Sequence, residues 1–270
     1  MTRWSSAEEP APAAKTPRFR FYAMDTGLNG PDVPKMEDKV ALLKKLGYAG
    51  IDYWMNPKAL PQMLDLLDKQ GLELCAVYTT PALGWKPDAA FTDAVKLMKG
   101  RATRIETAIG GGKLKPSDPE GDTQAIEMLK AVSDLCADTG PVVSVYPHRG
   151  NWTERVEDGV RLAKAVGRKN VGTNFNLVHW KWVRPAKPAA EILAEALPFL
   201  KTVTINGLKG DQIVSLDEGD FDLAAFMTTL KKVGYAGIVG LQGYGVGGPS
   251  ETHLGRSMAK WKEILKAIGE

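Results

Sequence analysis

Two of the three histidines in this chain follow short apolar segments, His148 in "VSVYPHRG" and His179 in "NFNLVHW". An imidazole has a pKa near neutrality, so it can act as a general base, a general acid or a neutral hydrogen-bond donor. Pro147 stops the first segment, so we expect His148 to face a cleft rather than the core. Both histidines are therefore candidate catalytic residues, with loop bracing as the alternative role. His253 is assigned a structural role in the last predicted helix.

Carboxylates end other segments of the same kind. Glu106 is the third candidate catalytic residue, as an acid or base that assists a histidine. Its alternative role is structural, because Arg104 lies two residues earlier on the same face of a predicted strand and could pair with it. Asp25 and Asp52 could take part in proton transfer or serve only as turn or cap residues.

Aromatic and amide side chains gather at the same segment ends. Flat aromatic faces suit the apolar faces of sugar rings, and amides offer hydroxyls both a donor and an acceptor. A lysine in this position could hold a developing enolate oxygen electrostatically. The predicted partner is therefore a small-molecule carbohydrate, although single tryptophans could instead pack loops. The candidate substrate-binding residues are Asp52, Trp54, Tyr146, Asn176, Trp180, Asn206, Lys209 and Gln242.

The elements that must position these residues alternate regularly along the chain. Short runs rich in β-branched or aromatic residues alternate with amphipathic stretches, a pattern typical of parallel βαβ units. The pattern predicts strands over residues 18–24, 50–54, 72–78, 102–109, 142–146, 171–176, 202–206 and 237–241. Helices are predicted over residues 36–46, 61–69, 88–99, 123–138, 153–166, 189–197, 222–233 and 251–268.

The phrase "KKLGYAGI" at Lys44 returns as "KKVGYAGI" at Lys231, 187 residues later. Its lysines and first glycine are typical of a helix C-terminus, and its second glycine leads into a strand. The spacing equals six units of about 31 residues, a usual length for a βα pair. We therefore predict a single-domain (β/α)8 TIM barrel over residues 18–270, with its active site at the carboxyl ends of the strands. A doubly wound sheet is the alternative, but no G-x-G-x-x-G follows the first strand.

Composition narrows the class of partner. The formal net charge is only +3, with both signs interspersed, so we expect neither nucleic acid nor membrane as a partner. Cys75 and Cys136 are too few for a disulfide framework and are expected to be buried thiols. The sequence leaves open whether the chain forms a homo-oligomer.

Residues 1–17 are rich in Ala, Pro, Ser and Glu and lack periodicity, which predicts a flexible lead-in. Such a stretch often follows a removed export signal. A periplasmic or secreted location is therefore one expectation, and a cytoplasmic location is the alternative.

Three segments resemble the xylose isomerase-like TIM barrels of the sugar phosphate isomerase/epimerase family, and the resemblance spans roughly residues 19–268. They are "LLKKLGYAGIDYW", "VYPHRGNWTERVEDGVRLAKAVGRKNVGTNFNLVHW" and "DFDLAAFMTTLKKVGYAGIVGLQGYG". The resemblance implies a sugar isomerase or epimerase that moves a proton beside a carbonyl at the mouth of the barrel. The same fold also hosts other chemistry, so a sugar lyase or hydratase and a non-catalytic carbohydrate-binding barrel are the alternatives.

The resemblance also implies a divalent metal, held by Glu, Asp, His and Glu after strands five to eight. The corresponding residues here are Tyr146, Asn176, Thr204 and Gln242, and none matches. Losing three carboxylates and an imidazole removes most of the charge that binds a hard cation. We therefore assign no metal ligand and leave the cofactor open, with a relocated metal on the remaining bases as the alternative.

Overall fold

Eight parallel strands close into a barrel. The computed structural model describes residues 18–270, and the predicted lead-in over residues 1–17 lies outside them. The strands run around the barrel in the order β1-β10-β7-β6-β5-β4-β3-β2, which confirms the predicted (β/α)8 TIM barrel. Their bounds are β1 (Phe19–Met24), β2 (Gly50–Trp54), β3 (Glu73–Thr79), β4 (Arg104–Thr107), β5 (Val142–Val145), β6 (Val171–Asn176), β7 (Leu200–Ile205) and β10 (Gly237–Leu241).

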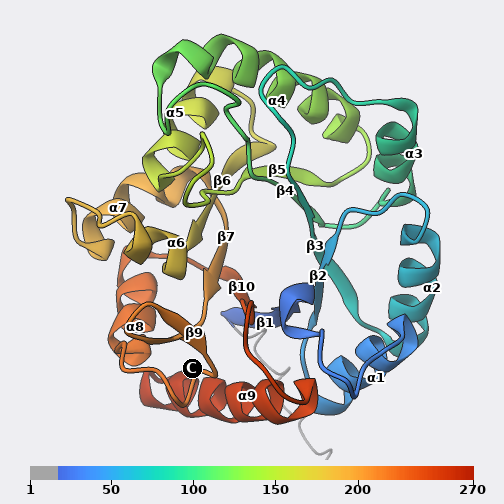
Figure 1. The fold of residues 1–270 in the computed structure, drawn as a ribbon, viewed down its shortest axis with the longest axis vertical. Helices are drawn as coiled ribbons and strands as arrows, with labels where there is room; N and C mark the ends of the chain where they lie inside the picture. Colours follow the sequence, from blue (N-terminus) through green and yellow to red (C-terminus); the bar gives the residue numbers. More distant parts are fainter. Residues whose placement is uncertain (1–17) are drawn as a thin grey trace, which may run out of the picture.

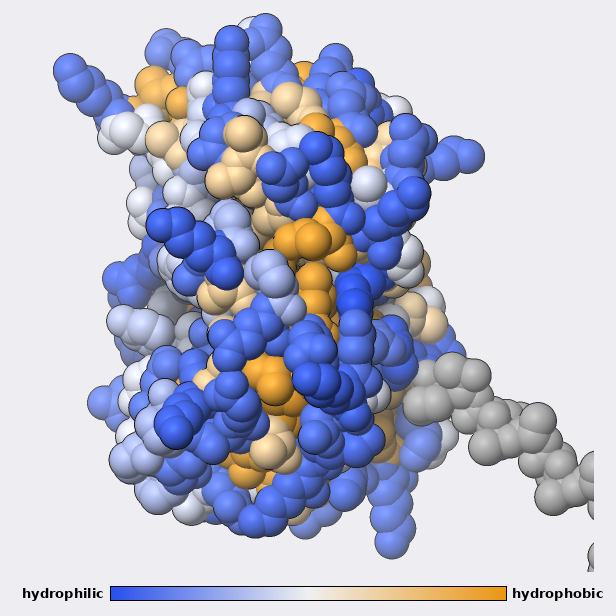
Figure 2. Space-filling view, turned by 90° about the vertical axis from the view of Figure 1, so that its right-hand side faces the viewer, coloured by the Kyte–Doolittle hydropathy of each residue, from blue (hydrophilic) through white to orange (hydrophobic). Residues whose placement is uncertain are grey.

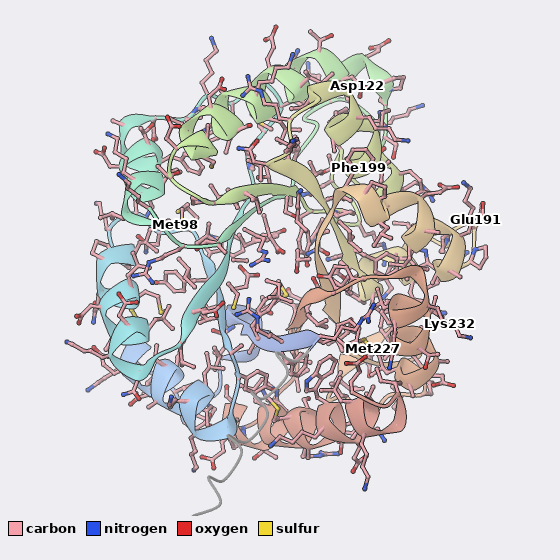
Figure 3. The ribbon with its side chains drawn as sticks, turned by 180° about the vertical axis from the view of Figure 1, so that it is seen from behind. Met98, Asp122, Glu191, Phe199, Met227 and Lys232 are labelled. Carbon is pink, nitrogen blue, oxygen red and sulfur yellow. The ribbon has the colours of Figure 1, made fainter. Side chains whose placement is uncertain are left out.

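Helices form a ring around the strands (Figure 1). Each buries one face, because apolar residues recur at helical spacing. In α8, Met227 is buried while Lys232 is exposed, and Figure 3 shows the two on opposite sides of the helix. The ring consists of α1 (Met36–Leu46), α2 (Leu60–Gln70), α3 (Ala89–Leu97), α4 (Asp122–Ala137), α5 (Val156–Val166), α7 (Ala189–Ala196), α8 (Leu223–Val233) and α9 (Ser250–Ala267).

Two groups of apolar side chains form the core. The larger fills the space between strands and helices, and the smaller lies inside the barrel around Tyr22, Cys75 and Tyr146. Seen from behind, side chains fill the centre of the barrel (Figure 3). Cys75 and Cys136 are buried free thiols, as expected. Because the interior of the barrel is packed, a ligand of the barrel has to bind at one of its mouths.

The repeated phrase forms the same helix-to-strand joint twice. Gly47 and Gly234 end α1 and α8 in the left-handed conformation, with φ of +85° and +95°. Each glycine donates its N–H back to the last helical turn, which is the expected C-cap. The joint therefore delivers β2 and β10 to the barrel in equivalent ways, as the sequence predicts.

A short helix and a two-stranded hairpin near the mouth of the barrel were not predicted. Helix α6 (Leu177–Trp182) follows β6 directly, and strands β8 (Gly207–Lys209) and β9 (Gln212–Val214) form a small hairpin after β7. Both are too short to show a periodic pattern in the sequence. They nevertheless shape the mouth, because each begins where a barrel strand ends.

On the side covered by α1, α2 and α3, the surface is largely hydrophilic, and hydrophobic residues show as patches among charged ones (Figure 2). Within residues 18–270, no helix combines the length and apolar character that crossing a bilayer requires.

Replacing Gly50 by Ala is expected to destabilise the barrel. An alanine Cβ there would lie 1.9 Å from the Glu73 carbonyl oxygen, so β2 and β3 would have to separate. Overpacking of this kind costs about 1–3 kcal/mol, measured as the free energy of unfolding in urea. Gly255→Ala in α9 is the control, since its Cβ meets nothing closer than 3.7 Å and alanine favours helix. Equal losses in the two variants would contradict the prediction.

Candidate functional site

A cavity of about 490 Å³ lies at the carboxyl ends of the barrel strands. Much of its wall is aromatic, and no lysine or arginine among residues 18–270 lines it. An aromatic, cation-free wall suits a ligand with apolar faces and hydroxyls better than an anion. Six of the predicted site residues line it, namely Asp52, Trp54, Tyr146, His148, His179 and Gln242.

The other five predicted residues do not line this cavity. Glu106, Asn176 and Asn206 are buried. Trp180 packs against Phe175, with ring centroids 5.6 Å apart, and Lys209 is exposed on the β8–β9 hairpin. Asn176 still acts on the cavity through its hydrogen bonds, whereas direct contact of the other four with a ligand stays a prediction.

Sequence reasoning did not propose several residues that line the cavity. Asn151 is one of them, because a tight turn folds it back toward the mouth: its N–H donates to the His148 carbonyl at 2.9 Å. The "HRGN" sequence carries the signal for such a turn, since Gly150 adopts φ of +86°. Tyr78, Trp182 and Tyr244 also line the wall, and Tyr244 is 66% exposed at the rim.

His148 and His179 lie side by side, with ring centroids 4.0 Å apart. One peptide segment sets the tautomer of both. His148 Nδ1 lies 2.9 Å from the Arg149 carbonyl oxygen, which only accepts, so Nδ1 carries the proton and Nε2 keeps a lone pair. His179 Nδ1 accepts from the Arg149 N–H at 3.3 Å, so its proton sits on Nε2. The pair therefore offers one acceptor and one donor.

Burial keeps both imidazoles neutral. Burial, with smaller contributions from the neighbouring His148 and Arg149, lowers the pKa of His179 to about 2. Burial also lowers the pKa of His148, although its bond to the Arg149 carbonyl opposes the shift. His179 Nε2 has no hydrogen-bond partner within residues 18–270. A buried donor without a partner is costly, so a ligand oxygen that reached this N–H would relieve that cost.

Asn176 links three elements beneath the cavity floor. Its Nδ2 donates to the Tyr146 hydroxyl and, at 2.7 Å, to Gln242 Oε1. Its Oδ1 accepts from the backbone N–H of His179 at 3.2 Å and so caps α6. All three side chains are buried and uncharged. Burial raises the pKa of Tyr146 well above its usual range, so its phenol stays protonated.

Two carboxyl groups are buried in the same region. Asp52 lines the cavity and Glu106 is completely buried. Burial raises the pKa of Glu106 to about 7, although the Asn174 amide, which donates to it at 2.8 Å, opposes the shift. Burial and the nearby Glu106 raise the pKa of Asp52. Asp52 therefore favours the neutral acid, and Glu106 does so below about pH 7; a neutral acid can donate a hydrogen bond.

The predicted pairing of Glu106 with Arg104 is not formed. The Arg104 guanidinium instead donates to the carbonyl oxygens of Ala102 at 2.7 Å and Lys201 at 3.3 Å. Within residues 18–270, no ion pair reaches Glu106, and its Oε2 has no hydrogen-bond partner. Because Glu106 has no cation partner, burial has the largest effect on its pKa.

A family model described as the xylose isomerase-like TIM barrel matches residues 40–264. The chain belongs to the xylose isomerase-like TIM barrel family. The family expected from the three sequence segments is thereby confirmed. No protein with a curated function matches the sequence.

Solved structures of other barrels superpose closely on this member of the family. D-allulose 3-epimerase from Methylomonas sp. in complex with D-allulose aligns with a TM-score of 0.74 at 17% identity, over 92% of this chain and 97% of that one. 3-Keto-D-glucoside 4-epimerase from E. coli gives 0.69 at 15%, over 91% and 99%. The probable 3-DHS dehydratase of Bacillus anthracis gives 0.69 at 15%, over 90% and 98%. At these identities the likeness shows the shared fold alone.

The residues at the family's usual metal positions do not fit a divalent cation in this xylose isomerase-like barrel. Asn176 ends β6, Tyr146 and Gln242 directly follow β5 and β10, and Asn206, rather than Thr204, directly follows β7. None is anionic, and three of them are hydrogen-bonded to one another. Hard cations prefer anionic oxygen, and within residues 18–270 no three His, Cys, Asp or Glu side chains converge on a point.

Glu106→Gln is expected to flatten the pH dependence of stability. Because the folded-state pKa of about 7 exceeds the ordinary value of 4.5, Glu106 makes the free energy of unfolding fall as pH rises from about 4.5 to about 7. The fall is about 3 kcal/mol, obtained from urea unfolding at each pH. Glu127→Gln, at an exposed position on α4, should keep the wild-type slope. A slope in Glu106→Gln equal to that of wild type would contradict the prediction.

Divalent metals are expected to leave the thermal midpoint of unfolding unchanged. A metal at 100 times its dissociation constant would stabilise a protein that binds it by about 2.7 kcal/mol. Thermal melts with millimolar Mg²⁺, Mn²⁺, Co²⁺ or Zn²⁺ should therefore overlay the melt without metal. Elemental analysis of protein purified without chelator should find less than one metal per chain, and a stoichiometric metal that raises the midpoint would refute the prediction.

Proposed function

We propose that the barrel acts on an unphosphorylated sugar or sugar derivative as an isomerase or epimerase and transfers a proton at the carbon beside a carbonyl. The observation that carries this proposal is the pair of opposite tautomers on the cavity wall. His148 keeps a lone pair and His179 keeps an N–H, and both side chains line the same 490 Å³ space. A base beside a donor is the minimum that enolisation requires.

The proton transfer balances without a metal or an oxidant. His148 Nε2 takes the proton from the carbon, and the electron pair of the C–H bond moves into the carbonyl to give an enediol or enediolate. Neutral donors hold the developing oxygen charge, namely His179 Nε2–H, the Tyr146 hydroxyl and the protonated Asp52. Epimerisation follows when a second acid, such as the protonated Asp52, supplies a proton to the other face of the same carbon. Isomerisation follows when His148 returns its proton to the former carbonyl carbon while the neighbouring hydroxyl proton moves to the former carbonyl oxygen.

The wall of the cavity supports an uncharged sugar. Phosphate recognition relies on arginine, lysine or a helix N-terminus, and the described lining includes no cationic side chain. Trp54 and Trp182 instead offer flat faces, and Gln242 and Asn151 offer amides for hydroxyls. The epimerases among the structural neighbours are consistent with this class of ligand.

A non-catalytic carbohydrate-binding barrel is the second candidate. The observation that favours it is the uncharged cluster of Tyr146, Asn176 and Gln242, which stands where the family resemblance implies metal-binding carboxylates. Such a protein would keep the sugar pocket without the proton transfer. Binding without turnover distinguishes it from the enzyme.

His148→Ala is expected to abolish proton transfer and spare binding. The test incubates unphosphorylated aldoses and ketoses, including D-allulose and D-fructose, in D₂O and follows deuterium at the carbon beside the carbonyl by NMR. Losing a general base typically costs a factor of roughly 10² to 10⁴ in rate. The dissociation constant, from titration calorimetry, should change much less, because His148 is one of many wall residues.

His253→Gln is the matched control, since this histidine is buried in α9 outside the cavity lining. It should exchange deuterium at the wild-type rate. Sugar binding without any exchange in the wild-type protein would favour the binding barrel. Preferential turnover of D-fructose 6-phosphate over D-fructose would contradict the uncharged substrate.

A further inference from the structure

A second hollow, of about 330 Å³, adjoins the main cavity beside the ends of β2 and β3. The two spaces share Trp54, Tyr78 and Thr80 in their linings. Trp54 borders both, and 51% of its surface is exposed. A ligand seated in the main cavity can therefore extend past the Trp54 indole into the second hollow.

Aromatic rings wall this hollow on two sides. Trp54 and Tyr78 lie with ring centroids 5.1 Å apart, and Trp85 meets Phe91 edge-on at 5.0 Å. No charged side chain among residues 18–270 contributes to the lining. Flat apolar walls without charge favour a neutral ring that stacks on them.

The backbone holds the wall in place before any ligand arrives. The loop after β3 pairs with Gly110 after β4: the Gly110 N–H donates to Pro81 and the Gly110 carbonyl accepts from Leu83, each at 2.9 Å. Asp88 caps α3 by accepting from the Phe91 N–H at 2.8 Å, which fixes the Phe91 ring. A preformed wall spares a ligand the entropy cost of ordering a loop.

We propose that this hollow, termed the β2–β3 subsite and formed by Trp54, Tyr78, Thr80, Ala82, Trp85 and Phe91, binds the second ring of a glycoside whose first sugar occupies the main cavity. The carbonyl that the proposed function requires is then a ketone on the first sugar ring, because the anomeric carbon of a glycoside has no carbonyl. The inference rests on the proposed function, because it extends the same substrate from one ring to two. Its support is the continuity of the two spaces through Trp54 and the neutral, aromatic lining. Either a second sugar or an aromatic aglycone presents the flat face that such a wall recognises.

Titration calorimetry on the full chain tests the subsite. The probes are D-glucose, D-galactose and D-mannose, each with its methyl glycoside, its p-nitrophenyl glycoside and a disaccharide that carries it at the non-reducing end. At least one two-ring compound is expected to bind roughly five- to tenfold more tightly than the matching methyl glycoside. A gain for the p-nitrophenyl compound alone identifies an aromatic aglycone, and a gain for the disaccharide alone identifies a second sugar.

Amino-acid substitutions test whether the gain in affinity from the second ring arises in the β2–β3 subsite. Trp85→Ala should remove it and leave the affinity for the methyl glycoside unchanged, whereas Trp85→Phe should keep most of it. Ala82→Trp tests the same point by filling the hollow from an exposed position, so it does not depend on whether Trp85→Ala folds. Trp182→Ala, which alters only the main cavity, should weaken one-ring and two-ring ligands alike.

The outcomes separate this inference from the proposed function. Sugars that bind without any gain from a second ring would overturn the subsite alone. A gain that survives in both Trp85→Ala and Ala82→Trp would also overturn it, because the second ring would then lie elsewhere. Failure of every sugar and glycoside to bind would overturn the proposed function, and the subsite with it.

Discussion

The side-chain amide of Asn176 holds three parts of the barrel mouth in fixed positions relative to one another. It donates to Tyr146 and Gln242 from one end and caps α6 from the other. An aspartate could accept the cap bond but has no hydrogen to donate, and it would place a charge against the Gln242 oxygen. The position of His179 depends on the cap, because its own N–H makes that bond. The geometry of the histidine pair thus follows from a residue beneath the cavity.

The region beneath the cavity is polar and almost free of formal charge. Glu106 is buried without a cation and Asp52 is buried beside it, so Asp52 favours the neutral acid and Glu106 does so below about pH 7. Burial likewise removes the charge from the two histidines. Neutral groups cost less to bury than ions, provided that their hydrogen bonds are made. Several buried polar atoms of residues 18–270 have no partner, and Asp52 Oδ1 and His179 Nε2 are two that belong to residues lining the cavity. A ligand that supplied the missing partner would gain most there.

Local patterns predicted the barrel well because each βα unit has its own strand-like run followed by an amphipathic stretch. The strands over residues 50–54, 171–176 and 237–241 were predicted with the bounds that the structure shows. Helix α6 and the β8–β9 hairpin were not predicted because both are too short to show a periodic pattern. Lys209 lies on this hairpin and does not line the cavity. Strand-end position alone placed six predicted residues on the wall. The tautomers could not be predicted, since the Arg149 peptide that sets them carries no side-chain signal.

The proposed proton transfer takes place among neutral side chains. Its barrier must therefore be lowered by the fixed positions of hydrogen-bond donors rather than by charged groups. A lowered pKa keeps His148 unprotonated at neutral pH, as a base requires, but it also makes the nitrogen a weaker base. The acidity of the carbon must then rise by hydrogen bonding to the carbonyl oxygen. Neutral donors in a low-dielectric site are stronger than in water, and fixed donors need no reorganisation as charge develops. Because Asn176 holds both Tyr146 and α6, the Tyr146 hydroxyl and the His179 N–H, two of the donors in the proposed reaction, are positioned by one residue, and a loss of its bonds would weaken them together.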